Sequence, residues 1–496
     1  MLRPLAIWLV PACFFLALTA RADDATPVSP PRWSFQVDAR DLEHGLLSIE
    51  MNLRGYAGPL LLCADMRGAG KSITKVRAMA QGAEIPLLRD SEQSDCFRAV
   101  APTSGPLVVR YQSDLGDLAN HHGDPDFAAR VGDGGFIFND ESVLLRPEPL
   151  PEQASIEISF SLPPGVSVAA PWKLIDRSQS RFASDARQYD AGSYVALGKL
   201  HALAAIDSHG GVFEVQLLAG AHRASEAALR GWVEKAAHAV GDFYGGVPTG
   251  RALVFLVPIA GESDPGVFGT TLHRATPSVV MFFGADANDE AFRDDWMATH
   301  ELFHVGNPRL TSKVRWFNEG TATYYQDVLR ARAGMASQEK IWSDLYDGFT
   351  RFCAPLDRHS LADESEHLRE RHHFVNVYWA GACLFFRADV LIREHSNGKR
   401  SLDDLLRALL EKSMKEMLDE DQLTAALDEA AGGKKISAML QANQLESLEP
   451  LYKKLGIVPI AKNQVKLDDA AKGAALRRAI LEERATSAPR SSEIPR

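Results

Sequence analysis

The 496-residue sequence has no long apolar run beyond its first twenty residues, few cysteines, no internal repeat, and fewer basic than acidic residues. A membrane-spanning helix needs roughly 20 apolar residues, so the mature chain is expected to have no stable membrane span. The formal net charge of −11 and the lack of a basic stripe argue against nucleic acid as a partner. What remains is the composition of a globular protein of roughly three domains, whose oligomeric state is left open.

The first residues have the pattern of a secretory signal. A basic Arg3 precedes an apolar run from Leu5 to Ala20, and small residues stand at Ala20 and Ala22. This arrangement predicts a signal peptide over residues 1–22, because the run is too short for a membrane anchor. The mature protein is therefore expected to be exported, periplasmic or extracellular, with a net charge that falls from −11 to −13 as two arginines are removed.

Four cysteines remain after the predicted cleavage: Cys63, Cys96, Cys353 and Cys383. In an oxidising compartment they permit three pairings. Bridges within domains, Cys63 with Cys96 and Cys353 with Cys383, are favoured, and four free buried thiols are the alternative.

The pattern of apolar and polar residues changes along the chain. Apolar residues alternate with polar ones over residues 47–53 and 156–162, which is typical of half-buried strands. Residues 33–180 are therefore expected to form an all-β, sandwich-like domain. Residues 181–335 combine a helix opening at Ser225 with buried strands and further helices, and form the second predicted domain.

The remainder is predicted to be mainly helical. Residues 336–460 carry helical spacing with short polar connections, and residues 461–496 are expected to form a charged helix and a disordered tail. The predicted fold class is a multidomain α+β protein with an N-terminal β domain and a helical C-terminal region.

The stretch HELFHVGNPRLTSKVRWFNEG carries candidate metal ligands. HELFH is expected to lie on a helix that begins near Asp289 or Asp294 and stops at Gly306, Asn307 and Pro308. His300 and His304 then project from one face, where two imidazoles can share an ion. Glu301 sits beside the pair, in the position of a general base.

A catalytic zinc needs three protein ligands and one open position. Glu319 is the candidate third ligand, because a fourteen-residue connection is enough to bring a second helix back alongside the first. Thr323 and Gln326 share the face of Glu319 and are expected to orient the ligands. The alternatives are two surface histidines that match by chance, and a structural zinc, which usually has four cysteine or histidine ligands.

Three segments together resemble a known family: HELFH, WFNEGTATYYQDVLRARAG and VYWAGACLFFRADVLIREHSNGKRSLDDLLRAL. They are similar to the glycyl aminopeptidase family of gluzincin zinc metallopeptidases. The resemblance implies a thermolysin-like catalytic domain, with His300, His304 and Glu319 as zinc ligands and Glu301 as the base. It also implies that Tyr378 stabilises the tetrahedral intermediate.

The sequence departs from the family in several places. Members carry a glutamate that helps to anchor the free amino terminus of the substrate, and GTTLH has Leu272 there, although Gly269 and His273 fit. Ala380 stands where the family has lysine, and Gly306 where it has tryptophan. The PDZ-like domain with which members often end is expected to be absent.

The predicted function is zinc-dependent hydrolysis of peptide bonds in peptide or protein substrates, with aminopeptidase specificity in doubt because a leucine cannot pair with an ammonium group. His273, His372 and His373 are possible further donors near the site. The alternative is a catalytically weak or inactive peptidase scaffold that binds peptides or proteins.

Overall fold

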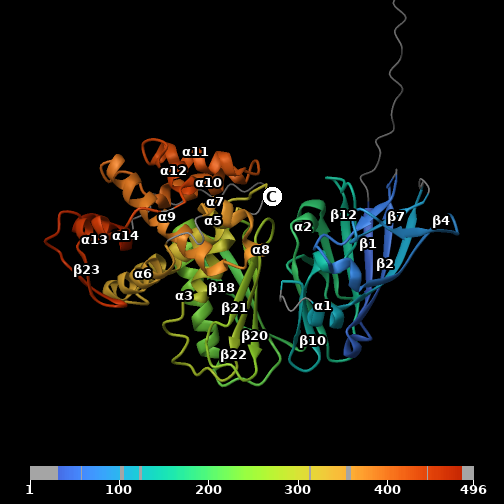
Figure 1. The fold of residues 1–496 in the computed structure, drawn as a ribbon. Coiled ribbons are helices and arrows are strands. Elements are labelled where there is room, and N and C mark those ends of the chain that lie inside the picture. Colours follow the sequence, from blue (N-terminus) through green and yellow to red (C-terminus); the bar gives the residue numbers. More distant parts are fainter. Residues whose placement is uncertain are drawn as a thin grey trace, which may run out of the picture.

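The computed structural model describes residues 32–56, 59–100, 105–121, 126–311, 314–353, 359–443 and 445–482. The chain folds into an N-terminal β-rich part and a C-terminal part in which helices cover a mixed sheet (Figure 1). The expected α+β class is confirmed. The predicted signal peptide and the final residues of the predicted tail lie outside the described residues.

The largest sheet of the N-terminal part has eight strands in the order β14-β15-β12-β1-β2-β8-β4-β5. The strands predicted from alternation lie in it: Leu47, Ile49, Met51 and Leu53 of β2 are buried, with polar residues between them. Neighbouring strands run antiparallel, except β1 and β12, which are parallel. The strands are β1 (Arg32–Asp38), β2 (Leu46–Arg54), β4 (Ile73–Ala80), β5 (Ala83–Ile85), β8 (Leu107–Asp114), β12 (Ser155–Ser161), β14 (Lys173–Asp176) and β15 (Arg181–Asp185).

Two four-stranded sheets, β11-β3-β7-β6 and β13-β16-β10-β9, complete this part. Strand β16 pairs with β10 and β13, so the strands of the N-terminal part continue past residue 180, the predicted end of the β domain. The remaining elements are β3 (Leu61–Cys63), β6 (Leu87–Arg89), β7 (Cys96–Ala99), β9 (Ala128–Val131), β10 (Gly135–Asn139), β11 (Arg146–Pro147), β13 (Ser167–Ala169), β16 (Tyr194–Gly198), η1 (Leu42–His44), η2 (Ala69–Ser72), η3 (Asp140–Ser142), α1 (Leu115–His121) and α2 (Ala186–Asp190).

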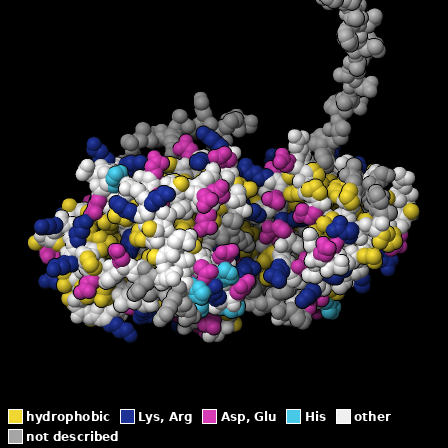
Figure 2. Space-filling model, turned by 45° about the horizontal axis from the view of Figure 1, so that its top comes forward, with side chains coloured by type: hydrophobic (Ala, Val, Ile, Leu, Met, Phe, Trp, Pro, Cys, Tyr) yellow, Lys and Arg dark blue, Asp and Glu magenta, His cyan; other side chains and the backbone are white. Residues whose placement is uncertain are grey.

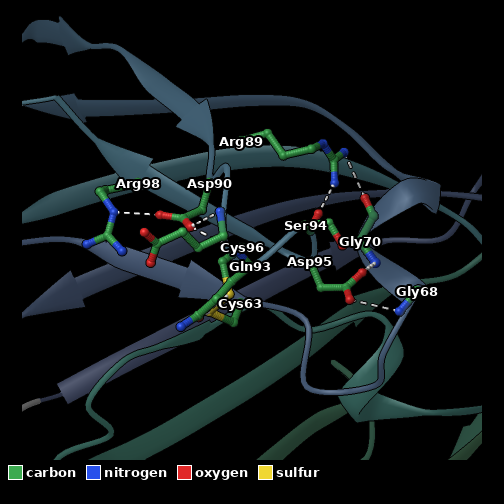
Figure 3. Close-up of a disulfide and its surroundings, with 11 residues drawn as sticks. Cys63, Gly68, Gly70, Arg89, Asp90, Gln93, Ser94, Asp95, Cys96 and Arg98 are labelled. Carbon is green, nitrogen blue, oxygen red and sulfur yellow. Dashed lines mark hydrogen bonds and ion pairs between the residues drawn. A yellow bond between two sulfur atoms is a disulfide. The ribbon is translucent and has the colours of Figure 1, made fainter.

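Both predicted disulfides are confirmed. Cys63 and Cys96 are paired neighbours on β3 and β7 and form one bridge. Polar contacts hold the loop beside it: Arg98 donates to Asp90 over 2.6 Å, and Asp95 accepts from the backbone of Gly68 and Gly70 (Figure 3). Cys353 and Cys383 form the second bridge and tie the end of α6 (Gln338–Phe352) to α9 (Phe374–His395).

The C-terminal part begins with a six-stranded sheet of order β17-β19-β20-β22-β21, with β18 paired to β19. The central strands β19, β20 and β22 are parallel, and β21 is antiparallel at one edge. Helix α3 begins where predicted, because the Ser225 hydroxyl accepts from the backbone of Ala228. The elements are β17 (Leu200–Ala202), β18 (Ile206–Ser208), β19 (Gly211–Leu218), α3 (Glu226–Tyr244), β20 (Arg251–Ile259), β21 (Phe268–Leu272) and β22 (Ser278–Gly284).

Helices follow almost to the end of the described chain. One of them, α9, is long and apolar enough to cross a membrane, contrary to the expectation from the sequence, but 67% of its apolar window is buried inside the protein. A hairpin, β23 (Ile457–Ala461) and β24 (Gln464–Leu467), was not predicted. The helices are α4 (Met297–Phe303), η4 (His304–Gly306), α5 (Arg315–Arg332), α6 (Gln338–Phe352), α7 (Leu361–Glu366), α8 (Leu368–Arg371), α9 (Phe374–His395), α10 (Leu402–Ser413), α11 (Glu420–Ala430), α12 (Lys435–Gln441), α13 (Glu449–Leu455) and α14 (Ala474–Leu481).

The two parts share an apolar interface. Buried residues of β9, β10 and β16 pack against one face of β19, β20 and β22 in a continuous cluster. On the face drawn in Figure 2, acidic and basic side chains are interspersed over both parts. The members of the cluster are Val131, Ile137, Tyr194, Ala196, Leu218, Leu253, Phe255, Val257, Val280 and Phe282.

Candidate metal centre

The HELFH segment forms a short buried helix, α4, extended by the 3-10 turn η4 that ends at Gly306. The predicted end of the helix is confirmed, but the predicted start is wrong. The helix begins at Met297, whose backbone N–H donates to the carboxylate of Asp295 over 2.8 Å. His300 and His304 project from this segment, with ring centroids 5.0 Å apart.

Helix α5 brings Glu319 to the two histidines. Nε2 of His300 and Nε2 of His304 each lie 3.5 Å from the same oxygen of Glu319, and all three side chains are nearly buried. Ligand atoms about 2.0–2.1 Å from a tetrahedral zinc lie about 3.3 Å from one another, and both nitrogen–oxygen distances are close to that spacing, so the residues present fit a zinc ion. Burial alone would raise the pKa of Glu319, but the facing His304 and His300 outweigh it and hold that pKa well below its usual value.

Two amides hold the other nitrogens of these imidazoles. Nδ1 of His300 lies 2.9 Å from Oε1 of Gln326, which accepts its proton and leaves Nε2 free to ligate. The side-chain nitrogen of Asn307 lies 3.0 Å from Nδ1 of His304. Turning that amide by 180° exchanges its oxygen and nitrogen and offers His304 the same kind of acceptor. Thr323 is buried on α5, but the described contacts include no hydrogen bond from it to either histidine.

Glu301 is held beside the histidines by the edge strand β21. Thr271 donates its hydroxyl proton toward Glu301, with 2.9 Å to the carboxylate oxygen and 3.0 Å to the backbone oxygen. Burial raises the pKa of Glu301, while His300 and His304 oppose that rise. A carboxylate with a raised pKa, anchored through one oxygen, is suited to exchange protons.

Tyr378 reaches the site from α9. Its ring stacks on His300 with centroids 6.4 Å apart. Helices α5 and α9 touch at their backbones, since a Cβ added to Gly320 would lie 2.7 Å from Gly381. This close approach brings the helix that carries Tyr378 against the helix that carries Glu319. Burial first, and then the charge of Glu319, raise the pKa of Tyr378, so its hydroxyl keeps its proton.

The sequence has no matching protein-family model and no match among curated proteins. Its structure is similar to that of an aminopeptidase N family protein from Idiomarina loihiensis, with a TM-score of 0.69, 19% identity, and coverage of 88% of this chain and 82% of that chain. A second similar structure is the M1 zinc metallopeptidase from Deinococcus radiodurans, with a TM-score of 0.55, 14% identity, and coverage of 84% and 94%. A third is yeast LTA4 hydrolase in complex with bestatin, with a TM-score of 0.54, 13% identity, and coverage of 84% and 68%.

The chain has the fold of the M1 zinc metallopeptidases. At these identities the likeness concerns the fold, and it does not single out the glycyl aminopeptidase branch. The order of an N-terminal β-rich domain, a mixed sheet and a helical C-terminal region is the M1 architecture.

Two departures from the family pattern have structural counterparts within this M1 fold. Gly306 leaves room for the ring of Tyr244, because an added Cβ would lie 2.3 Å from it, so an aromatic ring from α3 occupies the space beside the second histidine. Leu272 packs against the apolar interface between the two parts. A leucine there stabilises the interface and offers no charge to a substrate.

Among the three histidines considered as further donors, His273 is the one that lies at the site. Its ring faces His304 with centroids 6.5 Å apart. Burial, reinforced by His304, lowers the pKa of His273 to about 3, so it is neutral. His373 instead contacts Glu364 over 2.9 Å, and His372 occupies a left-handed turn at the end of α8.

A second group, His359, Asp363 and Glu364, also brings potential ligand atoms within 4.8 Å of one another. Nη1 of Arg371 lies 2.6 Å from Asp363 and 3.1 Å from Glu364. A guanidinium group thus already pairs with both carboxylates, which makes this group a poorer metal site than the first.

Two charged residues near the first group were not predicted. Arg315, one turn before Glu319, lies 3.4 Å from its second oxygen, and i,i+4 spacing could have indicated this pair. Asp126 comes from the N-terminal part and accepts from Thr270 of β21 over 2.9 Å. Local sequence offers no signal for Asp126, because the contact spans 144 residues.

Proposed function

We propose that the protein is an exported zinc-dependent peptidase that hydrolyses peptide bonds in peptides or proteins. The observation that carries the proposal is the convergence of two imidazole Nε2 atoms on one Glu319 oxygen, each at 3.5 Å, with Glu301 beside them. His300, His304 and Glu319 would hold the ion, and a fourth position would stay open for water and substrate. The M1 fold supports the same assignment.

A zinc ion held there supplies a Lewis acid for the scissile carbonyl and lowers the pKa of water toward ~7. Gln326 keeps His300 in the ligating tautomer. Glu301 accepts a proton from the attacking water and delivers it to the leaving amine. Thr271 holds one oxygen of Glu301 and leaves the other for this transfer.

Tyr378 is proposed to donate a hydrogen bond to the oxygen that becomes negative as the carbonyl is attacked. Its raised pKa keeps the phenol protonated at neutral pH, which a donor requires. Arg315 holds the second oxygen of Glu319 over 3.4 Å and thereby orients the carboxylate.

A peptide substrate is supported by β21, which lies at the edge of its sheet next to Glu301. An unpaired strand edge can hydrogen-bond an extended peptide. The resemblance to the glycyl aminopeptidases favours removal of amino-terminal residues. Leu272 weakens that finer assignment, because it gives no charge to hold an amino terminus.

The test begins with the zinc content of the mature protein, followed by incubation with a mixed peptide library and mapping of the cleaved bonds by mass. Glu301→Gln is expected to retain zinc and lower kcat by about 10²–10⁴-fold. Release of single amino-terminal residues would identify an aminopeptidase, and internal cuts an endopeptidase.

Two outcomes would contradict the proposal. Full zinc occupancy without cleavage would indicate instead a scaffold that binds peptides or proteins. A protein that takes up no zinc would contradict both functions. Glu339→Gln, on the exposed start of α6, is the matched control and is expected to change neither zinc content nor rate.

A further inference from the structure

Large apolar side chains are exposed around the candidate site. Of the thirteen exposed large hydrophobic residues described, five lie in or next to three of the four segments that carry site residues, namely β21, α4 and α9. Exposed apolar groups that gather in one place mark binding surfaces more often than scattered ones do. The five are Val267, Phe268, Trp296, Phe374 and Val375.

Trp296 is the member that contacts a candidate metal ligand. Its indole meets the His300 imidazole edge to face, with centroids 5.6 Å apart, while 44% of the residue is exposed. Tyr378 stacks on the same imidazole. A substrate carbonyl placed at the ion would therefore lie near both the proposed hydrogen-bond donor and an exposed indole.

The chain at Trp296 is fixed by the hydrogen bonds of its neighbour, Asp295. Trp296 immediately precedes α4, and the neighbouring Asp295 accepts from the backbone of Met297 over 2.8 Å and from the indole of Trp232 over 3.1 Å. Gly266, one residue before Val267, packs against the start of α4, because a Cβ on Gly266 would lie 2.8 Å from the Met297 side chain. Little conformational entropy is lost when a rigid aromatic surface binds a ligand.

We propose that Trp296 recognises a large apolar side chain of the peptide substrate next to the cleaved bond, where the segment before β21 approaches the start of α4. The inference rests on the proposed peptidase function and adds a substrate class to it, peptides with an aromatic or large aliphatic residue at that position. Trp296 determines specificity here and takes no part in the chemistry.

The test measures binding, so it does not depend on turnover. Two pairs of hydroxamates are titrated into the zinc-loaded protein by calorimetry, because the hydroxamate group fixes the register at the ion. Phenylalanine and alanine hydroxamate place their side chains on one side of the reacting position. Benzyl- and methyl-substituted succinyl hydroxamates place theirs on the other.

In one of the two pairs, the hydroxamate with the larger side chain is expected to bind at least about tenfold more tightly than the one with the smaller side chain. Trp296→Ala should reduce this preference to about twofold or less, and Trp296→Phe should retain most of it, since an aromatic surface remains. Leu88→Ala, an exposed leucine of the N-terminal part, is the control and should leave the preference unchanged.

The ratio of the two dissociation constants within a pair distinguishes side-chain recognition by Trp296 from a purely structural role of Trp296. If Trp296 only supported His300, its loss would weaken both members of a pair equally and lower zinc content. Equal binding within both wild-type pairs, or a preference that survives in Trp296→Ala, would overturn the inference while zinc binding and cleavage stand. A protein that binds no zinc would overturn the peptidase proposal together with it.

Discussion

Two groups of histidine and carboxylate side chains lie in the C-terminal part, and they differ in what neutralises their carboxylates. At His300, His304 and Glu319, two imidazole nitrogens converge on a single oxygen. At His359, Asp363 and Glu364, a guanidinium group already bonds both carboxylates. Residue types already favour the first group, because two imidazoles and one carboxylate form a ligand set of catalytic zinc sites. Arg315 also contacts Glu319, but through the oxygen that does not face the imidazoles, so the converging nitrogens and the acceptor behind His300 distinguish a metal centre from an ion-pair network.

The largest expected effect in this comparison belongs to Glu319→Gln. A neutral amide is a poor zinc ligand, so zinc affinity should fall by more than about 100-fold. A loss of about 10–100-fold is typical when only a hydrogen-bond partner of a ligand is removed. Hydrolysis should be lost with it. Asp363→Asn, the equivalent change in the second group, should leave one zinc per chain by elemental analysis after dialysis. Zinc loss in Asp363→Asn alone would reverse the ranking of the two groups.

Tyr378→Phe should reduce kcat by about 10²–10³-fold, because a donor to the developing negative charge is removed. Zinc content should stay unchanged, since the tyrosine is not a ligand. Tyr346→Phe on α6 serves as the control and should keep the full rate. Initial rates on a peptide found in the library test are the measurement, and an unchanged rate in Tyr378→Phe would exclude the tyrosine from the chemistry.

Gln326→Leu should weaken zinc binding by about 10–100-fold, because Nδ1 of His300 loses its acceptor and the ligating tautomer is no longer favoured. Gln326→Glu restores an acceptor and should recover most of the affinity. Competition with a chelator measures both variants. Equal affinities for the leucine variant and the wild type would show that packing alone orients His300.

Arg371→Gln should have the smallest effect on zinc binding. Removing the guanidinium leaves Asp363 and Glu364 without their shared counter-ion, so a second zinc is expected to bind, more weakly than the first. Arg369→Gln is the matched control, because Arg369 lies 3.8 Å from Asp126 and does not contact the two carboxylates. Calorimetric titration would show one site in the control and two in Arg371→Gln. A single site in both would mean that geometry also disfavours the second group.

Local periodicity explains what could be predicted of this site. Helical spacing places His300 with His304, and Glu319 with Gln326, on common faces whatever the rest of the chain does. Alternation likewise predicted β2 and β12, because one face of each strand is buried. The cysteine pairing could also be predicted, because the two cysteines of each bridge are close in the sequence and lie in the same part of the chain.

Contacts between distant elements could not be predicted. Tyr244 occupies the space at Gly306 only because α3 packs against α4, which no local pattern encodes. Asn307 was interpreted as part of a helix stop, and it both ends the turn and contacts His304. His373 is a possible donor by sequence, yet its imidazole contacts Glu364 on α7 instead of the metal centre. Tertiary packing decided each of these positions.

The apolar cluster between the two parts has a consequence for motion. Domains of one chain usually move relative to each other, unless the interface between them is large and hydrophobic. Here strands β9, β10 and β16 pack on β19, β20 and β22 through side chains such as Phe255 and Val257, which are fully buried. Hinge bending between the parts would expose these side chains to water. Amide hydrogens on both sides of the interface are therefore expected to exchange together, as one slowly opening unit.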